Sequence, residues 1–123
     1  MLAAARAERL FAGSLVVAAA TARAVREAEA ELVTLVASGA ERGHTEDRAC
    51  AEYLETLICG GSVDLSTLLE ALRSSERYRQ VSSGCWPGFP PSDLELALTA
   101  DRFDFAMPVS RDELGLRLTA RGV

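Results

Sequence analysis

Short apolar runs rich in β-branched residues alternate with longer helix-forming stretches in the first half of the chain. The apolar run at 10–15 predicts a strand that ends in a tight loop at Gly13 and Ser14. The Ala-rich stretch at 16–29 predicts a helix. The run at 31–37 is the strongest strand signal in the chain, and a loop containing Ser and Gly follows it.

Residues 46–59 show the periodicity of an amphipathic helix. Its apolar positions recur at i, i+3 and i+4, and they are Cys50, Tyr53, Leu54, Leu57 and Ile58. Two glycines after this stripe predict the end of the helix. A second amphipathic helix follows, with Asp64 or Ser66 as its N-cap. Residues 75–80 continue the helical region after a break.

Prolines interrupt the last third of the chain, which then ends in strands. The sequence SSGCWPGFPP at 82–91 predicts irregular chain. Ser92 and Glu95 form a capping-box pattern that opens a short helix. The runs at 103–109 and 114–118 predict two final strands. Helices and strands that interleave in this way indicate α/β layers.

The composition is that of an ordinary globular domain. The 123 residues are 49% hydrophobic and 25% charged, and we expect a single α/β domain over residues 1–123. The net charge is −5 and the arginines are scattered among acids, which argues against a nucleic-acid partner. The apolar runs are too short for a membrane span, which needs about 20 apolar residues.

Cysteine use indicates a reducing compartment. The three cysteines are Cys50, Cys59 and Cys85. They are too few and too widely spaced for a disulfide framework or a zinc site, so we expect reduced thiols in a cytoplasmic protein. The N-terminus superficially resembles a signal peptide, but Glu8 lies in the would-be basic region and the apolar run passes into helical sequence.

Two adjacent carboxylates, Glu46 and Asp47, open the helix that follows the 31–37 strand and its loop. Ligands of α/β proteins bind at the carboxyl ends of parallel strands, where such a loop lies. One interpretation is structural, because an acid in a first turn stabilises a helix by roughly 0.3–1 kcal/mol. The other is a Mg²⁺ site, since Mg²⁺ binds carboxylates together with phosphate oxygens. The residues alone favour the structural interpretation.

Several neighbours of this pair are candidate ligand contacts. Gly39 and Gly43 would let backbone N–H groups approach a phosphate, although a plain turn also explains them. Ser14 would line the same cleft if the strands 10–15 and 31–37 are parallel neighbours. His44, the only histidine, is either an exposed loop residue or a general acid.

Other reactive residue types fit structural roles. Cys50 lies on the apolar stripe of its helix, which indicates a core position. Cys85 and Trp86 lie in irregular chain that would edge a cleft. Asp101 and Asp104 lie in a turn, where solvated charges are the simpler interpretation and a site-facing role is the alternative.

Three segments together resemble one family. FAGSLVVAAATARAV resembles its Gly-Ser strand end and Ala-rich helix, and LVASG with TEDRACA resembles its strand, glycine loop and helix start. DLELALTADRFDFAMPV resembles its last helix, Asp-rich turn and closing strand. The family is the 2-phosphosulfolactate phosphatases, which are associated with coenzyme M biosynthesis. The resemblance covers nearly all of this chain but only the C-terminal half of a usual member.

The resemblance implies a layered α/β/α sandwich with a short, mostly parallel sheet. It also implies a Mg²⁺-dependent phosphatase of a small acidic phosphoester such as 2-phospho-3-sulfolactate. Glu46 and Asp47 would then be the metal-binding and catalytic residues, and Ser14, Gly39 and Gly43 would bind the substrate. The family's Arg- and Thr/Asn-bearing segments precede the matched half, so we expect weak or no activity without a complementing N-terminal half.

A different class of function competes with catalysis. Val17, Glu52 and Cys85 depart from the family pattern, and two of these changes remove groups that would face a phosphate. The alternative is a non-catalytic, truncated remnant that acts as an oligomerisation or ligand-binding module. Half of a layered domain exposes apolar faces, so this interpretation predicts a homo-oligomer.

Overall fold

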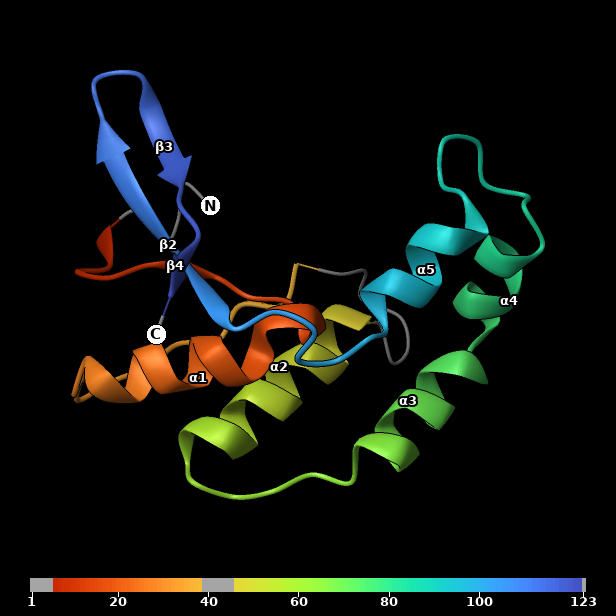
Figure 1. Ribbon diagram of the computed structural model, residues 1–123, viewed down its shortest axis with the longest axis horizontal. Coiled ribbons are helices and arrows are strands. Elements are labelled where there is room, and N and C mark those ends of the chain that lie inside the picture. The colour runs from red at the N-terminus through yellow and green to blue at the C-terminus, as the bar shows by residue number, and fades with distance from the viewer. Residues whose placement is uncertain (1–5, 39–45, 123) are drawn as a thin grey trace.

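The computed structural model describes residues 6–38 and 46–122 of the chain. Helices α1 to α5 and a small sheet make up this part (Figure 1). The elements are β1 Phe11–Ala12, the 3₁₀ helix η2 Leu15–Val17, α1 Ala18–Glu27, α2 Glu46–Ile58, α3 Leu65–Arg73, α4 Glu76–Ser82, α5 Pro91–Ala97, β2 Phe105–Asp112, β3 Gly115–Leu118 and β4 Arg121–Gly122. The mixture confirms the predicted α/β class.

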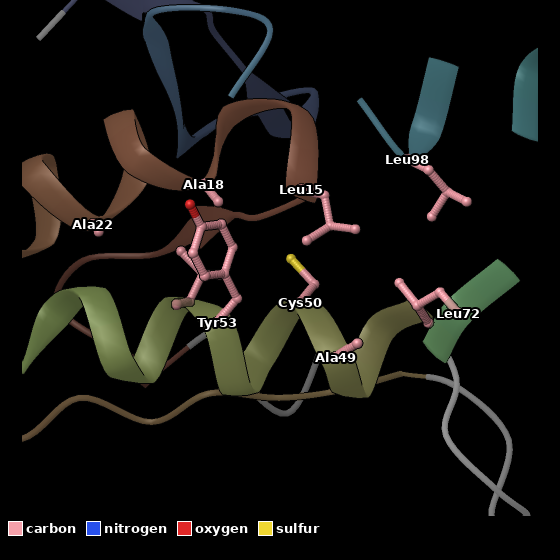
Figure 2. Close-up of a cluster of buried hydrophobic side chains, with 9 residues drawn as sticks. Leu15, Ala18, Ala22, Ala49, Cys50, Tyr53, Leu72 and Leu98 are labelled. Atoms are coloured by element: carbon pink, nitrogen blue, oxygen red, sulfur yellow. The ribbon is translucent and has the colours of Figure 1, made fainter. Parts of the chain in front are cut away.

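The core lies where η2 and α1 pack on α2 (Figure 2). Ala18 and Ala22 are buried on α1, and their small side chains leave room for Tyr53 of α2. Cys50 and Leu54 belong to the same buried cluster, as the amphipathic stripe predicts. Exclusion of this apolar surface from water is the main force that holds the two helices together.

Helices α3, α4 and α5 extend the molecule on the side away from the sheet (Figure 1). Leu72 of α3 and Leu98, just after α5, join the main core cluster. Asp64 is the N-cap of α3, because its carboxylate accepts hydrogen bonds from the backbone N–H groups of Ser66 and Thr67. Of the two predicted caps, Asp64 is therefore the one that the structure uses.

Two helix starts in this region have different causes. Ser75 caps α4 by accepting a hydrogen bond from the Tyr78 N–H, so the predicted break before this helix is real. The capping box predicted at Ser92 is wrong, because α5 begins one residue earlier, at Pro91. Proline suits the first helical position, where its fixed φ and missing N–H cost nothing.

The sheet is antiparallel at every pairing in the described residues. Strand β2 is central, and β1, β3 and β4 all pair with it in the antiparallel sense. Phe11 of β1 lies opposite Pro108 of β2. The β2–β3 hairpin projects from one end of the molecule (Figure 1). The predicted mostly parallel sheet is therefore wrong for this part of the chain.

The segment 31–37 accounts for that error. It was predicted to be the second parallel strand, but it forms no strand and lies on the surface. Leu32 is 82% exposed and Val36 is 76% exposed. A β-branched run favours a strand only where neighbouring strands pack against it. No described residue pairs with this run, so its local preference for β-structure does not lead to hydrogen bonding within a sheet.

Candidate functional site

Glu46 and Asp47 occupy the first turn of α2, as predicted, and their side chains have different partners. The Glu46 Oε1 atom lies 3.4 Å from Nε of Arg77 on α4. The Asp47 Oδ2 atom accepts a hydrogen bond of 2.9 Å from the Ser38 hydroxyl. Helix α2 therefore directs one carboxylate towards α4 and the other towards the end of the exposed 32–38 segment.

A small pocket of about 70 Å³ lies beside Glu46 and Arg77. Its apolar walls come from α3, α4, α5 and the chain between them, and they include Leu72, Val81, Phe89, Leu94 and Leu98. The guanidinium of Arg77 lies 4.9 Å from the centre of the Trp86 ring. Known ligand pockets measure roughly 300–1,000 Å³, so this one suits only a small ligand.

Two further residues belong to this site. The sequence does not predict Arg77, and it predicts Trp86 only as a residue at the edge of a cleft. Arg77 has no motif around it, and its helix brings it to Glu46 through tertiary packing. Trp86 was expected to edge a cleft, and it lines this pocket. An aromatic residue in proline-broken chain was the one available signal.

The predicted substrate contacts have different outcomes. Ser14 is half-buried, and its carbonyl accepts the Val17 N–H at 3.2 Å where η2 begins. It is absent from the lining of the pocket beside Glu46. Gly39, Gly43 and His44 lie outside the described residues. The substrate role of Ser14 and the two glycines stays a prediction.

Asp101 is a structural anchor that links three segments. Its Oδ1 atom accepts the Ala19 N–H at 2.7 Å, and its Oδ2 atom accepts the Tyr53 hydroxyl at 2.7 Å. It holds a positive φ of 55°, a conformation that Asp tolerates better than most residues. Asp101 is exposed in a turn, as the simpler interpretation expects, but its carboxylate also makes structural hydrogen bonds that this interpretation did not include. Asp104 forms an exposed ion pair with Arg23.

Burial raises the pKa of two side chains on α2, Cys50 and Tyr53. Burial, followed by the hydrogen bond and the charge of Asp101, raises the pKa of Tyr53 to about 12. Burial, with smaller effects from the charges of Asp47 and Asp101, raises the pKa of Cys50 to about 11. A thiol with such a pKa is protonated at neutral pH and is a poor nucleophile. Cys50 is thus a core residue, as its position on the stripe predicts.

Each of the two carboxylates suits a hard divalent cation by donor chemistry, but they face different partners, Arg77 and Ser38, so sharing one ion requires at least one of them to leave its partner. Within residues 6–38 and 46–122, no three His, Cys, Asp or Glu side chains gather into a metal-binding group. Mg²⁺ usually keeps several waters and takes one or two carboxylates plus substrate oxygens. Glu46 and Asp47, both partly solvent-accessible, provide that number of carboxylates.

These observations describe an α/β protein with an acidic helix start beside a small, arginine-bearing pocket. The sequence model of the 2-phosphosulpholactate phosphatase family matches residues 1–107. The chain belongs to this family. No curated protein and no solved structure matches it. In the described part of the chain, none of the helices has the length and apolar character needed to cross a membrane.

Proposed function

We propose that the chain is part of a Mg²⁺-dependent phosphatase of small acidic phosphoesters such as 2-phospho-3-sulfolactate. One observation carries the proposal: Glu46 and Arg77 lie together at a small pocket in a member of a phosphatase family. A carboxylate pair repels a phosphate dianion, and a cation between them removes that repulsion. The proposal therefore requires the metal that the acid pair suits.

Glu46 and Asp47 hold the metal in this proposal. Bound Mg²⁺ would polarise the phosphoryl group or lower the pKa of a bound water. Gly39 and Gly43 contribute contacts to the substrate anion in this proposal, and Ser14, which does not line the pocket beside Glu46, does so from outside it. We also propose that the chain is weakly active alone and gains activity with a separate N-terminal half that supplies further phosphate-binding groups.

Calorimetric titration with Mg²⁺ tests the metal site. We expect binding to the wild-type chain and none to the Glu46→Ala, Asp47→Ala double variant. The Glu52→Ala, Glu55→Ala variant is the matched control, because it removes two charges from the same helix outside the first turn. Equal binding to all three proteins, or binding to none, would contradict the metal assignment.

Phosphate release tests the activity. The chain is assayed with 2-phospho-3-sulfolactate and Mg²⁺, alone and mixed with an N-terminal half. We expect release to rise on mixing and to fall to background in the double variant. If the mixture released no phosphate, the proposal that an N-terminal half complements this chain would be wrong.

A second function is favoured by a specific observation, the exposed apolar surface. Four residues of the 32–36 run are more than a third exposed, and they are Leu32, Val33, Leu35 and Val36. Apolar patches of this kind mark interaction sites on soluble proteins. We propose a homo-oligomer on this basis. A clean monomer in light scattering at micromolar to millimolar concentration would contradict it.

A further inference from the structure

We propose that Arg77, stacked on Trp86, is the anion-binding group of the pocket between α3, α4 and α5. Its ligand is the phosphate or carboxylate group of a small organic acid. The inference deepens the proposed function, on which it rests for the identity of the substrate. Anion binding itself needs neither the metal nor catalysis, so it can be measured separately.

The contacts of Arg77 leave donors for a ligand. The guanidinium lies over the Trp86 ring, an arrangement in which the aromatic face attracts the cation. Nε lies 3.4 Å from Oε1 of Glu46, and within residues 6–38 and 46–122 this is the polar contact that the guanidinium makes. Arginine presents its N–H groups in a planar fork that matches the oxygens of phosphate and carboxylate. A small oxyanion can therefore pair with the outer edge of Arg77.

The surroundings of the guanidinium suit an anion that also has an apolar part. Leu72, Val81 and Leu98 are buried side chains that line the same pocket. The apolar part of a ligand can pack against these side chains while its charged group meets the guanidinium at the edge of the pocket. The volume of about 70 Å³ limits the occupant to a small acid. These properties select a compact, charged ligand with a short apolar part.

The carboxylate of Glu46 is the group that pairs with Arg77 in this structure, and this ion pair is weak. The side chains of Arg77 and Glu46 are 47% and 49% exposed, so solvent screens their ion pair. A ligand oxyanion that forms two parallel hydrogen bonds to the guanidinium displaces a carboxylate held this way. Displacement releases Glu46, the residue proposed to bind Mg²⁺. The ligand and the metal should therefore each strengthen the binding of the other.

Trp86 is the only tryptophan of the chain, so its fluorescence reports on this pocket alone. The chain is titrated without metal with inorganic phosphate and with 2-phosphoglycolate, at constant ionic strength. We expect a saturable change in Trp86 emission with both. Arg77→Gln should weaken the binding at least tenfold, and Arg77→Lys, which keeps the charge but lacks the fork, should be intermediate.

Arg79→Gln is the matched control. Arg79 lies on the same helix and pairs with Glu76, but it is absent from the pocket lining. The Arg79→Gln variant should bind inorganic phosphate and 2-phosphoglycolate as the wild type does. Circular dichroism checks that all variants keep their helices, and calorimetry repeats the titrations independently of the Trp86 signal. If Arg77→Gln misfolds, anion binding by Arg77→Lys is compared with that of the wild type. Weaker binding by Arg77→Lys supports the inference, and equal binding contradicts it.

The results separate this inference from the proposed function. Anion binding that depends on Arg77, without phosphate release either from the chain alone or from its mixture with an N-terminal half, supports the subsite and contradicts the phosphatase. Phosphate release that persists in Arg77→Gln with unchanged KM contradicts the subsite and leaves the phosphatase standing. Equal anion binding by Arg77→Gln and Arg79→Gln, or no saturable binding by the wild type, overturns the inference.

Discussion

At the scale of single residues, Asp101 shows how one side chain joins distant parts of the fold. The residue at the N-cap of α1, Val17, has no side-chain group for this role. Asp101 supplies the missing acceptor from more than 80 residues away and also holds the Tyr53 hydroxyl. One carboxylate therefore fixes α1, α2 and the turn before β2 relative to one another.

Loss of this carboxylate should destabilise the protein. Asp101→Ala removes a helix cap and a charge-assisted hydrogen bond, for an expected loss of about 2–3 kcal/mol in the free energy of unfolding. Asp104→Ala, which breaks only an exposed ion pair, should cost less than about 1 kcal/mol. Urea denaturation measures both. Similar losses in the two variants would show that Asp101 is not an anchor.

Tyr53 should make the stability sensitive to alkaline pH. Its pKa is about 12 in the folded protein against 10.0 for the unfolded side chain. The folded state holds the proton more tightly, so this contribution is complete below pH 10 and is lost as the pH rises towards 12. The difference in stability between the wild type and Tyr53→Phe should shrink across this range. A difference that stays constant from pH 8 to pH 11.5 would contradict the assignment.

At the scale of elements, the helices were largely predictable and the sheet was not. The stripe from Cys50 to Ile58 appears in the sequence because helix burial repeats every three to four residues. Strand direction depends instead on which distant segments meet. The run at 31–37 carries strong local β preference but has no described partner, whereas the short β1 pairs with β2. The anchoring role of Asp101 and the position of Arg77 at the pocket were not predictable for the same reason, since both arise from packing between elements.

The N-termini of α3 and α5 test how far a capping pattern in the sequence predicts a cap in the structure. Asp64 accepts two backbone N–H groups at the start of α3, whereas Ser92 lies inside α5 and caps nothing. Asp64→Ala should therefore lower the urea midpoint clearly, and Ser92→Ala should leave it nearly unchanged. Hydrogen bonds from Thr67 and Ser66 lower the pKa of Asp64, so its contribution is present at neutral pH and fades as the pH falls. Equal midpoints for the two variants would contradict this difference.

At the scale of the whole molecule, two regions carry the most exposed large apolar side chains of the described residues. One is the 32–36 run, and the other is the β2–β3 hairpin, where Leu114 is 93% exposed. The hairpin projects away from the helices (Figure 1). An isolated two-stranded hairpin buries little, so its apolar side chains gain from contact with another surface. Both regions are thus candidates for the contact that holds an oligomer together.

Charged substitutions should show which region is used. Leu32 and Val36 are mostly exposed in the folded chain, so Leu32→Asp with Val36→Asp should change the stability of the monomer by less than about 1 kcal/mol. The same pair of changes buries two carboxylates in any contact formed through this run, which should weaken association at least tenfold. Leu114→Asp tests the hairpin in the same way. Analytical ultracentrifugation of the wild type and the two variants assigns the contact. Dissociation by the double variant alone places it at 32–36, and dissociation by Leu114→Asp alone places it on the hairpin. Unchanged association in both variants excludes these two regions as its cause.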